Sequence, residues 1–172
     1  MAEIIKTYRQ AVPAARFIGK KYGDADCENG MFAHKWSEWF TNNLFAPLEA
    51  LQGGSAPFFE DSDAYIGLMR FKEGEPFEYW IGMFQPVGTT APAGYECVDF
   101  PALNLGVSWI YGPERELYML EDECADKLRA EGFEFAPDDN NAYWFFERYA
   151  CPRFTAPDDK GNVILDICLV VK

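Results

Sequence analysis

The stretch Tyr143-Trp-Phe-Phe-Glu-Arg-Tyr149 combines a run of aromatic side chains with one carboxylate, that of Glu147. Aromatic residues favour strands, so this run predicts an inner strand of a sheet. Side chains alternate between the two faces of a strand, which places Tyr143, Phe145, Glu147 and Tyr149 on one face. Burying an acid without a partner is costly. Glu147 therefore needs either a structural partner or a ligand.

The chain passes twice through the order strand, helix, strand, strand. Tyr65-Ile-Gly-Leu-Met-Arg-Phe71 aligns with the opening stretch at an offset of 78 positions. Such self-similarity indicates an internal repeat. The first copy is expected to have strands at 15–22, 63–71 and 77–85, with a helix over 29–45 that Pro47 ends or kinks. A linker at 86–94 and a short strand at 95–100 precede the second copy, with strands at 102–111, 142–154 and 163–171 and a helix at 113–131.

The prediction is an α+β fold, one domain over residues 1–172 made of two fused pseudo-repeats, about 14–86 and 94–172. Its sheet is mostly antiparallel and carries two main helices. Ligands tend to bind in concave sites between such units, so we expect a central groove where the two repeats meet.

Comparison of the two repeats shows which polar residues occur at equivalent positions in both and which occur in only one. Arg70 and Arg148 occupy equivalent positions, which suggests that both are solvated or structural. Glu147 instead aligns with Met69 and so breaks the internal symmetry. A functional carboxylate is one interpretation. The alternative is a structural acid that accepts bonds from tyrosine hydroxyls or pairs with an arginine.

The composition of the chain argues against several classes of function. The chain has 172 residues, a net charge of −13 and 17% aromatic residues, and its only basic cluster is Lys20-Lys21. Such a charge repels nucleic acid and anionic membranes and attracts cations. The start of the chain has no long apolar run, so neither a signal peptide nor a membrane span is expected. Five scattered cysteines without a C-x-x-C pair suggest a reducing cytoplasm. The single histidine, His34, argues against a histidine-based metal site or a Ser-His-Asp triad, and we expect no cofactor.

Three segments carry a resemblance to a known family: Phe146-Glu-Arg-Tyr149, the turn Pro157-Asp-Asp-Lys-Gly161 before a final apolar strand, and the strand–turn–strand Tyr95-Glu-Cys-Val-Asp-Phe-Pro-Ala-Leu103. Together they resemble the GyrI-like small-molecule-binding superfamily, which is also the effector-binding domain of AraC-type and MerR-type multidrug regulators. The resemblance covers about residues 14–172, and the duplicated plan is similar to the family's tandem SHS2 modules.

Two features depart from the family pattern. The last strand, Ile164 to Lys172, contains Cys168 and lacks the proline that is common there. About 14 residues precede the first predicted strand. That is too short for a helix-turn-helix, so we expect no direct binding to nucleic acid by that route.

The resemblance implies a groove for lipophilic, often cationic aromatic molecules. Aromatic faces attract cations, and a poorly solvated carboxylate adds charge complementarity. Glu147 would be the charge partner of the ligand, and Tyr149 would orient Glu147 or bind the ligand itself. Further wall candidates, each of which could instead belong to the core, are Trp36, Trp39, Phe40, Tyr65, Trp80, Trp109 and Tyr111.

The expected role is a stand-alone sensor, a buffer or a partner of a regulator, with a second copy of the chain as another candidate partner. A hydrolase of strained, electrophilic lipophilic compounds is the main alternative, with Glu147 as general base. A nucleophilic Cys151 or Cys168 would lack an activating histidine. A heme binder would lack an axial ligand other than His34. An interaction protein would need an exposed apolar patch.

Overall fold

The computed structural model describes all residues 1–172 and shows one eight-stranded sheet in which every neighbouring pair of strands is antiparallel. The strand order is β1-β6-β8-β7-β3-β4-β2-β5. The strands are β1 (Glu3–Val12), β2 (Ala15–Tyr22), β3 (Tyr65–Phe71), β4 (Glu78–Pro86), β5 (Glu96–Phe100), β6 (Leu103–Gly112), β7 (Tyr143–Tyr149) and β8 (Val163–Val171).

The helices belong to the two halves of the chain. α1 (Ala33–Thr41) and α2 (Ala46–Gln52) lie between β2 and β3, and α3 (Glu114–Leu117) and α4 (Glu121–Ala130) lie between β6 and β7. Short 3₁₀ turns, η1 (Asp24–Asp26) and η2 (Tyr118–Leu120), complete the list. No helix is long and apolar enough to cross a membrane.

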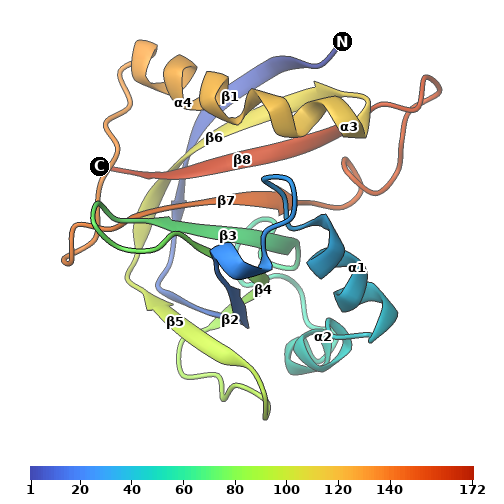
Figure 1. Cartoon of the computed structure of the whole chain (residues 1–172), viewed down its shortest axis with the longest axis vertical. Helices are drawn as coiled ribbons and strands as arrows, with labels where there is room; N and C mark the ends of the chain where they lie inside the picture. Colours follow the sequence, from blue (N-terminus) through green and yellow to red (C-terminus); the bar gives the residue numbers. More distant parts are fainter.

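The predicted α+β fold with its repeated unit is confirmed. From the outside inward, the first unit is ordered β2-β4-β3 and the second β6-β8-β7, so the two join where β3 pairs with β7. Figure 1 shows this junction at the centre of the sheet, with α1 and α2 to one side and α3 and α4 to the other. In this register Gly67 lies opposite Glu147, and Tyr65 lies opposite Tyr149.

One strand was not expected from the sequence. We predicted the first strand at Ala15, but residues 3–12 already form β1 along the edge of β6. The strand that precedes each repeat pairs with the other repeat, since β5 correspondingly lies beside β2. Lys6 and Arg9 give β1 the charged composition typical of an edge strand. Its partner lies about a hundred residues away in the chain, so no local pattern indicates the pairing.

The predicted helix over 29–45 was wrong in its extent. α1 stops at Thr41, Asn43 has a φ of 53°, and the chain then starts α2. Pro47 lies in the first turn of α2, where its missing N–H costs no helical hydrogen bond. The predicted helix over 113–131 is instead α3, η2 and α4 in succession. The strand predicted over 142–154 ends at Tyr149, and a loop follows.

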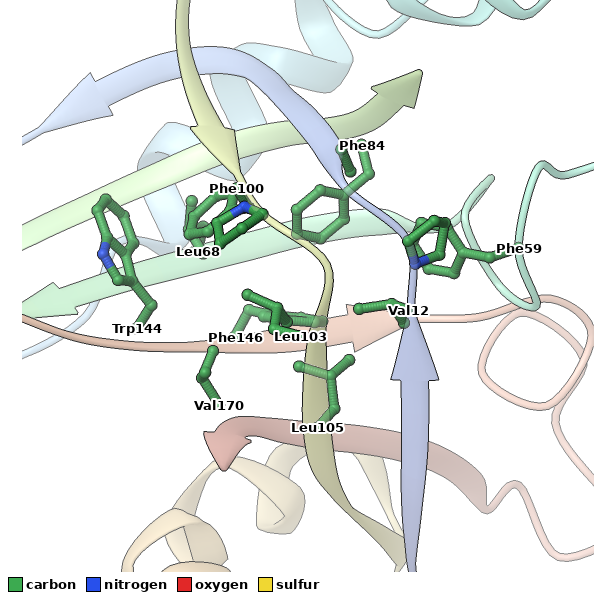
Figure 2. A pocket seen from close by; sticks show the side chains of 13 residues that line it. Val12, Phe59, Leu68, Phe84, Phe100, Leu103, Leu105, Trp144, Phe146 and Val170 are labelled. Atoms are coloured by element: carbon green, nitrogen blue, oxygen red, sulfur yellow. The ribbon is translucent and has the colours of Figure 1, made fainter. Parts of the chain in front are cut away.

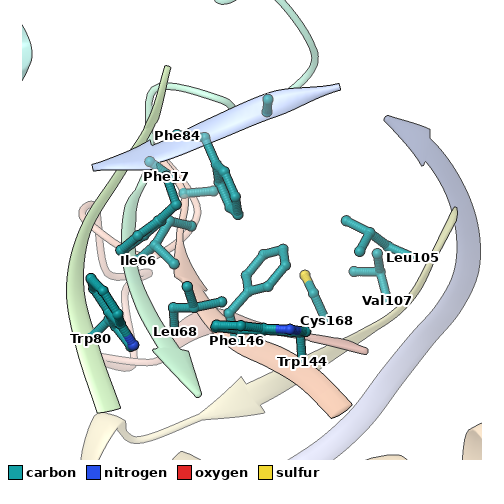
Figure 3. Close-up of a cluster of buried hydrophobic side chains, with 13 residues drawn as sticks. Phe17, Ile66, Leu68, Trp80, Phe84, Leu105, Val107, Trp144, Phe146 and Cys168 are labelled. Carbon is teal, nitrogen blue, oxygen red and sulfur yellow. The ribbon is translucent and has the colours of Figure 1, made fainter. Parts of the chain in front are cut away.

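The face of the sheet without helices carries the largest apolar cluster. Phe17, Trp80, Phe84, Phe146 and Leu105 point toward one another inside the curve of the sheet (Figure 3). The connections Pro13-Ala14 and Pro101-Ala102 each span only two residues and draw the distant edges together over this core. Where they approach, a hollow of about 20 Å³ remains among Val12, Phe59, Phe100 and Leu103 (Figure 2). It is apolar and holds about one water molecule's volume, so it is a packing gap rather than a ligand site.

Candidate functional site

The opposite face of the sheet contains a cavity of about 1200 Å³. It lies over the junction of β3 and β7, and its walls come from α1 and α2 on one side and from α3, η2 and the start of α4 on the other. Pockets for drug-sized ligands usually enclose about 300–1,000 Å³. The central groove predicted from the repeat is therefore present, and it is large enough for a bulky organic molecule.

Glu147 lines this cavity from β7. Its Oε2 atom accepts hydrogen bonds from the hydroxyls of Tyr79, at 2.8 Å, and Tyr149, at 2.9 Å. Trp36 Nε1 donates to the hydroxyl of Tyr79 at 2.9 Å, which completes a chain of donors that leads to the carboxylate. No lysine, arginine or histidine lies within ion-pair distance of Glu147. Burial raises the pKa of Glu147, and the two tyrosine bonds oppose that rise.

Gly67 makes room for this arrangement. A Cβ atom at Gly67 would lie 2.5 Å from the Tyr79 hydroxyl oxygen and 2.6 Å from Glu147 Oε2. Both separations are far shorter than a van der Waals contact. The glycine of the Tyr65-Ile-Gly segment thus allows β4 to bring Tyr79 against the carboxylate on β7. Sequence reasoning used this segment to find the repeat and missed its role in the site.

Aromatic rings pack around the carboxylate. The rings of Trp36 and Tyr149 meet edge to face at 4.8 Å, and those of Phe32 and Tyr79 stack in parallel at 4.3 Å. Tyr65 stacks on Phe45. Phe40 is 60% exposed at the cavity wall, so part of the apolar surface is open to solvent.

Five of the residues predicted from the sequence come together in this cavity: Glu147, Tyr149, Trp36, Phe40 and Tyr65. Alternation along β7 correctly placed Phe145, Glu147 and Tyr149 on one face, because all three line the cavity. Whether these five side chains bind a ligand stays a prediction.

The other four wall candidates lie elsewhere. Trp39 is the completely buried residue of α1, and its Nε1 donates to the Tyr22 hydroxyl at 2.8 Å. Trp80 belongs to the core on the opposite face of the sheet, one residue away from the cavity-lining Tyr79.

Trp109 and Tyr111 also lie away from the cavity. Trp109 packs against that opposite core with Lys6 and Arg153 over its ring. The Tyr111 hydroxyl donates to Asp158 at 2.6 Å and holds the turn before β8.

Several lining residues were missed. Tyr79, Tyr118, Glu121 and Phe154 all line the cavity. Tyr118 and Glu121 fall outside the apolar stripe of Leu117, Leu120, Cys124 and Leu128, so helical periodicity gave no signal for them. Alternation along β4 separates Tyr79 from Trp80 but does not show which of the two faces the cavity, so the sequence did not single out Tyr79.

All the charged side chains that line the cavity are acidic. Among its residues there are six carboxylates and no lysine, arginine or histidine; the acids are Glu49, Asp63, Glu114, Glu121, Asp122 and Glu147. Burial, then the negative charges of Glu147 and Asp122, raise the pKa of Glu121 to about 7. Like charges in a cleft with apolar walls reinforce one another, so the lining gives the cavity a negative electrostatic potential. No three His, Cys, Asp or Glu side chains are arranged to hold a metal ion.

Comparison with known proteins supports the fold. No family model matches the sequence, and no curated protein matches it. Solved structures do match. A protein from Staphylococcus aureus MU50 described as a bacterial transcription regulation protein is 17% identical, with a TM-score of 0.65 over 98% of this chain and 99% of that one.

Two further structures match over nearly all of this chain. SAV2435 bound to tetraphenylphosphonium is 15% identical, with a TM-score of 0.68 over 98% of this chain and 94% of SAV2435. EcmrR, solved in a complex with DNA, is 14% identical, with a TM-score of 0.54 over 97% of this chain and 57% of EcmrR. The chain therefore shares the fold of these three proteins, and the predicted resemblance is confirmed at the level of the fold.

Proposed function

We propose that the protein binds lipophilic cations in the cavity over β3 and β7 and acts as an effector-binding sensor linked to transcription regulation. The observation that carries this proposal is Glu147, a carboxylate inside an aromatic cavity that has hydrogen-bond donors but no cationic partner. A ligand cation would supply the missing charge.

The energetics favour such a ligand over a neutral one. A cation over an aromatic face gains about 0.5–2 kcal/mol, and Trp36 and Tyr149 offer such faces beside the carboxylate. The hydroxyls of Tyr79 and Tyr149 hold Glu147 in position before a ligand arrives, so little ordering remains to be done on binding. Because the cavity is wide and offers few directional polar contacts, it would select ligands by their size and charge.

The similar structures suggest the biological setting. SAV2435 was solved with tetraphenylphosphonium, a bulky lipophilic cation, and the matching region of EcmrR is part of a protein that binds DNA. The net charge of this chain, −13, disfavours binding to nucleic acid. We therefore assign it to the sensing step, with a regulator protein or a second copy of this chain as the partner that transmits the signal.

The test compares ions of nearly the same shape. Titration calorimetry and quenching of tryptophan fluorescence would measure binding of tetraphenylphosphonium and of tetraphenylborate, its anionic counterpart. We expect saturable binding of the cation and none of the anion. Glu147→Gln keeps the shape of the side chain and removes its charge, and it should weaken cation binding by roughly tenfold or more.

Glu38→Gln is the matched control, since Glu38 lies on α1, pairs with Lys35 and does not line the cavity. That variant should bind as the native protein does. Equal affinity for the two ions, or an unchanged affinity in Glu147→Gln, would contradict the proposal.

A hydrolase uses the same residue in a different way. The pKa of Glu147 is raised, as a general base requires, and only its Oε2 atom is bonded to the protein. Turnover of a strained electrophile, lost in Glu147→Gln, would favour that function. Binding of tetraphenylphosphonium without turnover of any such compound would favour the sensor.

A further inference from the structure

We propose that the cavity has two anionic poles, Glu147 on β7 and Glu121 at the start of α4, and that it is built for ligands carrying two positive charges. This inference rests on the proposed function, because it specifies the class of cation that the same cavity takes.

The fully buried acid of the molecule, Asp166, and its neighbour Asp61 have basic partners. Asp166 is fully buried and bonds Arg148 and Arg153, and Asp61 bonds Arg153 at 2.6 Å. Such pairing is the usual condition for burying a charge. The chain therefore has the means to neutralise acids inside the fold.

Glu121 has no such partner. Its side chain is half-buried, lines the cavity and makes neither an ion pair nor a hydrogen bond within the protein. Glu147 has no basic partner either, although two tyrosines bond it. The two unpaired acids thus face one cavity, and Glu121 lacks even the donors that steady Glu147. Its place in the first turn of α4 favours a negative charge there. No basic side chain neutralises that charge, and a second cationic group of a ligand would pair it.

The two acids also influence each other. The negative charge of Glu147 helps to raise the pKa of Glu121 to about 7, so that Glu121 holds a proton part of the time at neutral pH. A cation beside Glu147 cancels this repulsion, and a second cation beside Glu121 favours its ionised form. Binding of a dication should therefore release a proton, and its affinity should rise as the pH increases through about 7.

Other groups share this end of the cavity. Asp122 on α4 adds negative charge and acts on Glu121 directly. Glu114 and Tyr118 form a hydrogen bond at 3.4 Å on the same side, and the hydroxyls of Tyr79 and Tyr149 face Glu147. Burial raises the pKa values of all three tyrosines, so they stay neutral in this range. The single histidine does not line the cavity. The pKa of Glu121, about 7, places its titration near neutral pH.

The test uses a series of bis-quinolinium compounds with alkyl linkers of increasing length. Each is compared with a matched monocation that has the same linker and an uncharged aromatic second ring. Titration calorimetry in two buffers of different ionisation enthalpy would give the affinity and the number of protons released. At the best linker length we expect the dication to bind roughly tenfold more tightly and to release a proton on binding.

Substitutions then locate the second pole. Glu121→Gln should abolish the advantage of the dication and its proton release while leaving the affinity for the monocation within about twofold or improving it. Glu123→Gln is the control, because it removes the same charge from the same helix turn but does not line the cavity. That variant should keep the advantage of the dication.

The outcomes separate this inference from the proposed function. Binding of the monocation with no gain for any dication would overturn the second pole alone. The second pole would also be overturned if Glu121→Gln weakened the affinities for the dication and the monocation equally, or if the dication still bound more tightly in that variant. Absence of binding by either class would overturn the proposed function together with this inference.

Discussion

Replacing Gly67 by alanine tests whether the position of Glu147 depends on the missing side chain of β3. The new Cβ would lie 2.5 Å from the Tyr79 hydroxyl oxygen and 2.6 Å from Glu147 Oε2. Tyr79 cannot easily withdraw, because its ring is 6% exposed, stacks on Phe32 and is bonded by Trp36. The carboxylate of Glu147 must therefore move, and the hydrogen bond from Tyr79 is lost.

The magnitude follows from opposing effects. Overpacking costs about 1–3 kcal/mol, and a hydrogen bond to a charged group contributes about 1.5–3 kcal/mol. Alanine recovers about 0.5–1 kcal/mol of backbone entropy relative to glycine, and movement of the carboxylate relieves part of the clash. We expect the free energy of unfolding to fall by about 1–3 kcal/mol. The affinity for tetraphenylphosphonium should fall by roughly tenfold, the equivalent of about 1.4 kcal/mol.

Urea unfolding and calorimetric titration would measure the two effects. Gly23→Ala is the control, because a Cβ there meets no atom within 4 Å and the backbone φ is −123°. A double-mutant cycle with Glu147→Gln adds a second check, since effects that act through one carboxylate are not additive. Native affinity in Gly67→Ala, or full additivity in the cycle, would refute the reasoning.

Two further predictions concern stability. The pKa of Glu121 in the folded protein, about 7, lies above its ordinary value of 4.5, so the acid destabilises the fold increasingly as the pH rises between these values. Glu121→Gln should therefore raise the free energy of unfolding by about 1–3 kcal/mol above pH 7 and leave it unchanged below pH 4.5. Urea unfolding across the pH range would measure this difference. A gain in stability that does not depend on pH would contradict the prediction. Arg148→Met should lose about 3 kcal/mol because it removes a partner of the fully buried Asp166. Arg129→Met, which breaks the exposed pair with Asp126, should lose less than about 1 kcal/mol in the same assay, and equal losses would show that burial does not matter.

The repeat and the strand at its centre could be predicted from the sequence because both depend on local patterns. Alternation in Tyr143–Tyr149 placed Phe145, Glu147 and Tyr149 on one face, and the structure agrees. The match between residues 65–71 and 143–149 likewise anticipated two strands in equivalent positions, which turn out to be neighbours in the sheet. Composition anticipated an acidic molecule, and the cavity concentrates that charge.

Contacts between distant segments could not be predicted in the same way. Alternation shows that Tyr79 and Trp80 point to opposite faces, but not which face bears the cavity; that depends on how β4 pairs with β3 and β3 with β7. Pairing of β1 with β6 leaves no local signature either.

The site itself depends on such contacts. Gly67 matters only because the register sets it opposite Glu147. Glu121 feels the charge of that carboxylate only because α4 packs on β6 and β8 in the second half of the sheet. Local periodicity therefore determined the elements and the central acid. Only the tertiary structure decided which side chains surround that acid. Its neighbours across the sheet belong to strands far away in the chain, and no local sequence pattern encodes how those strands pair.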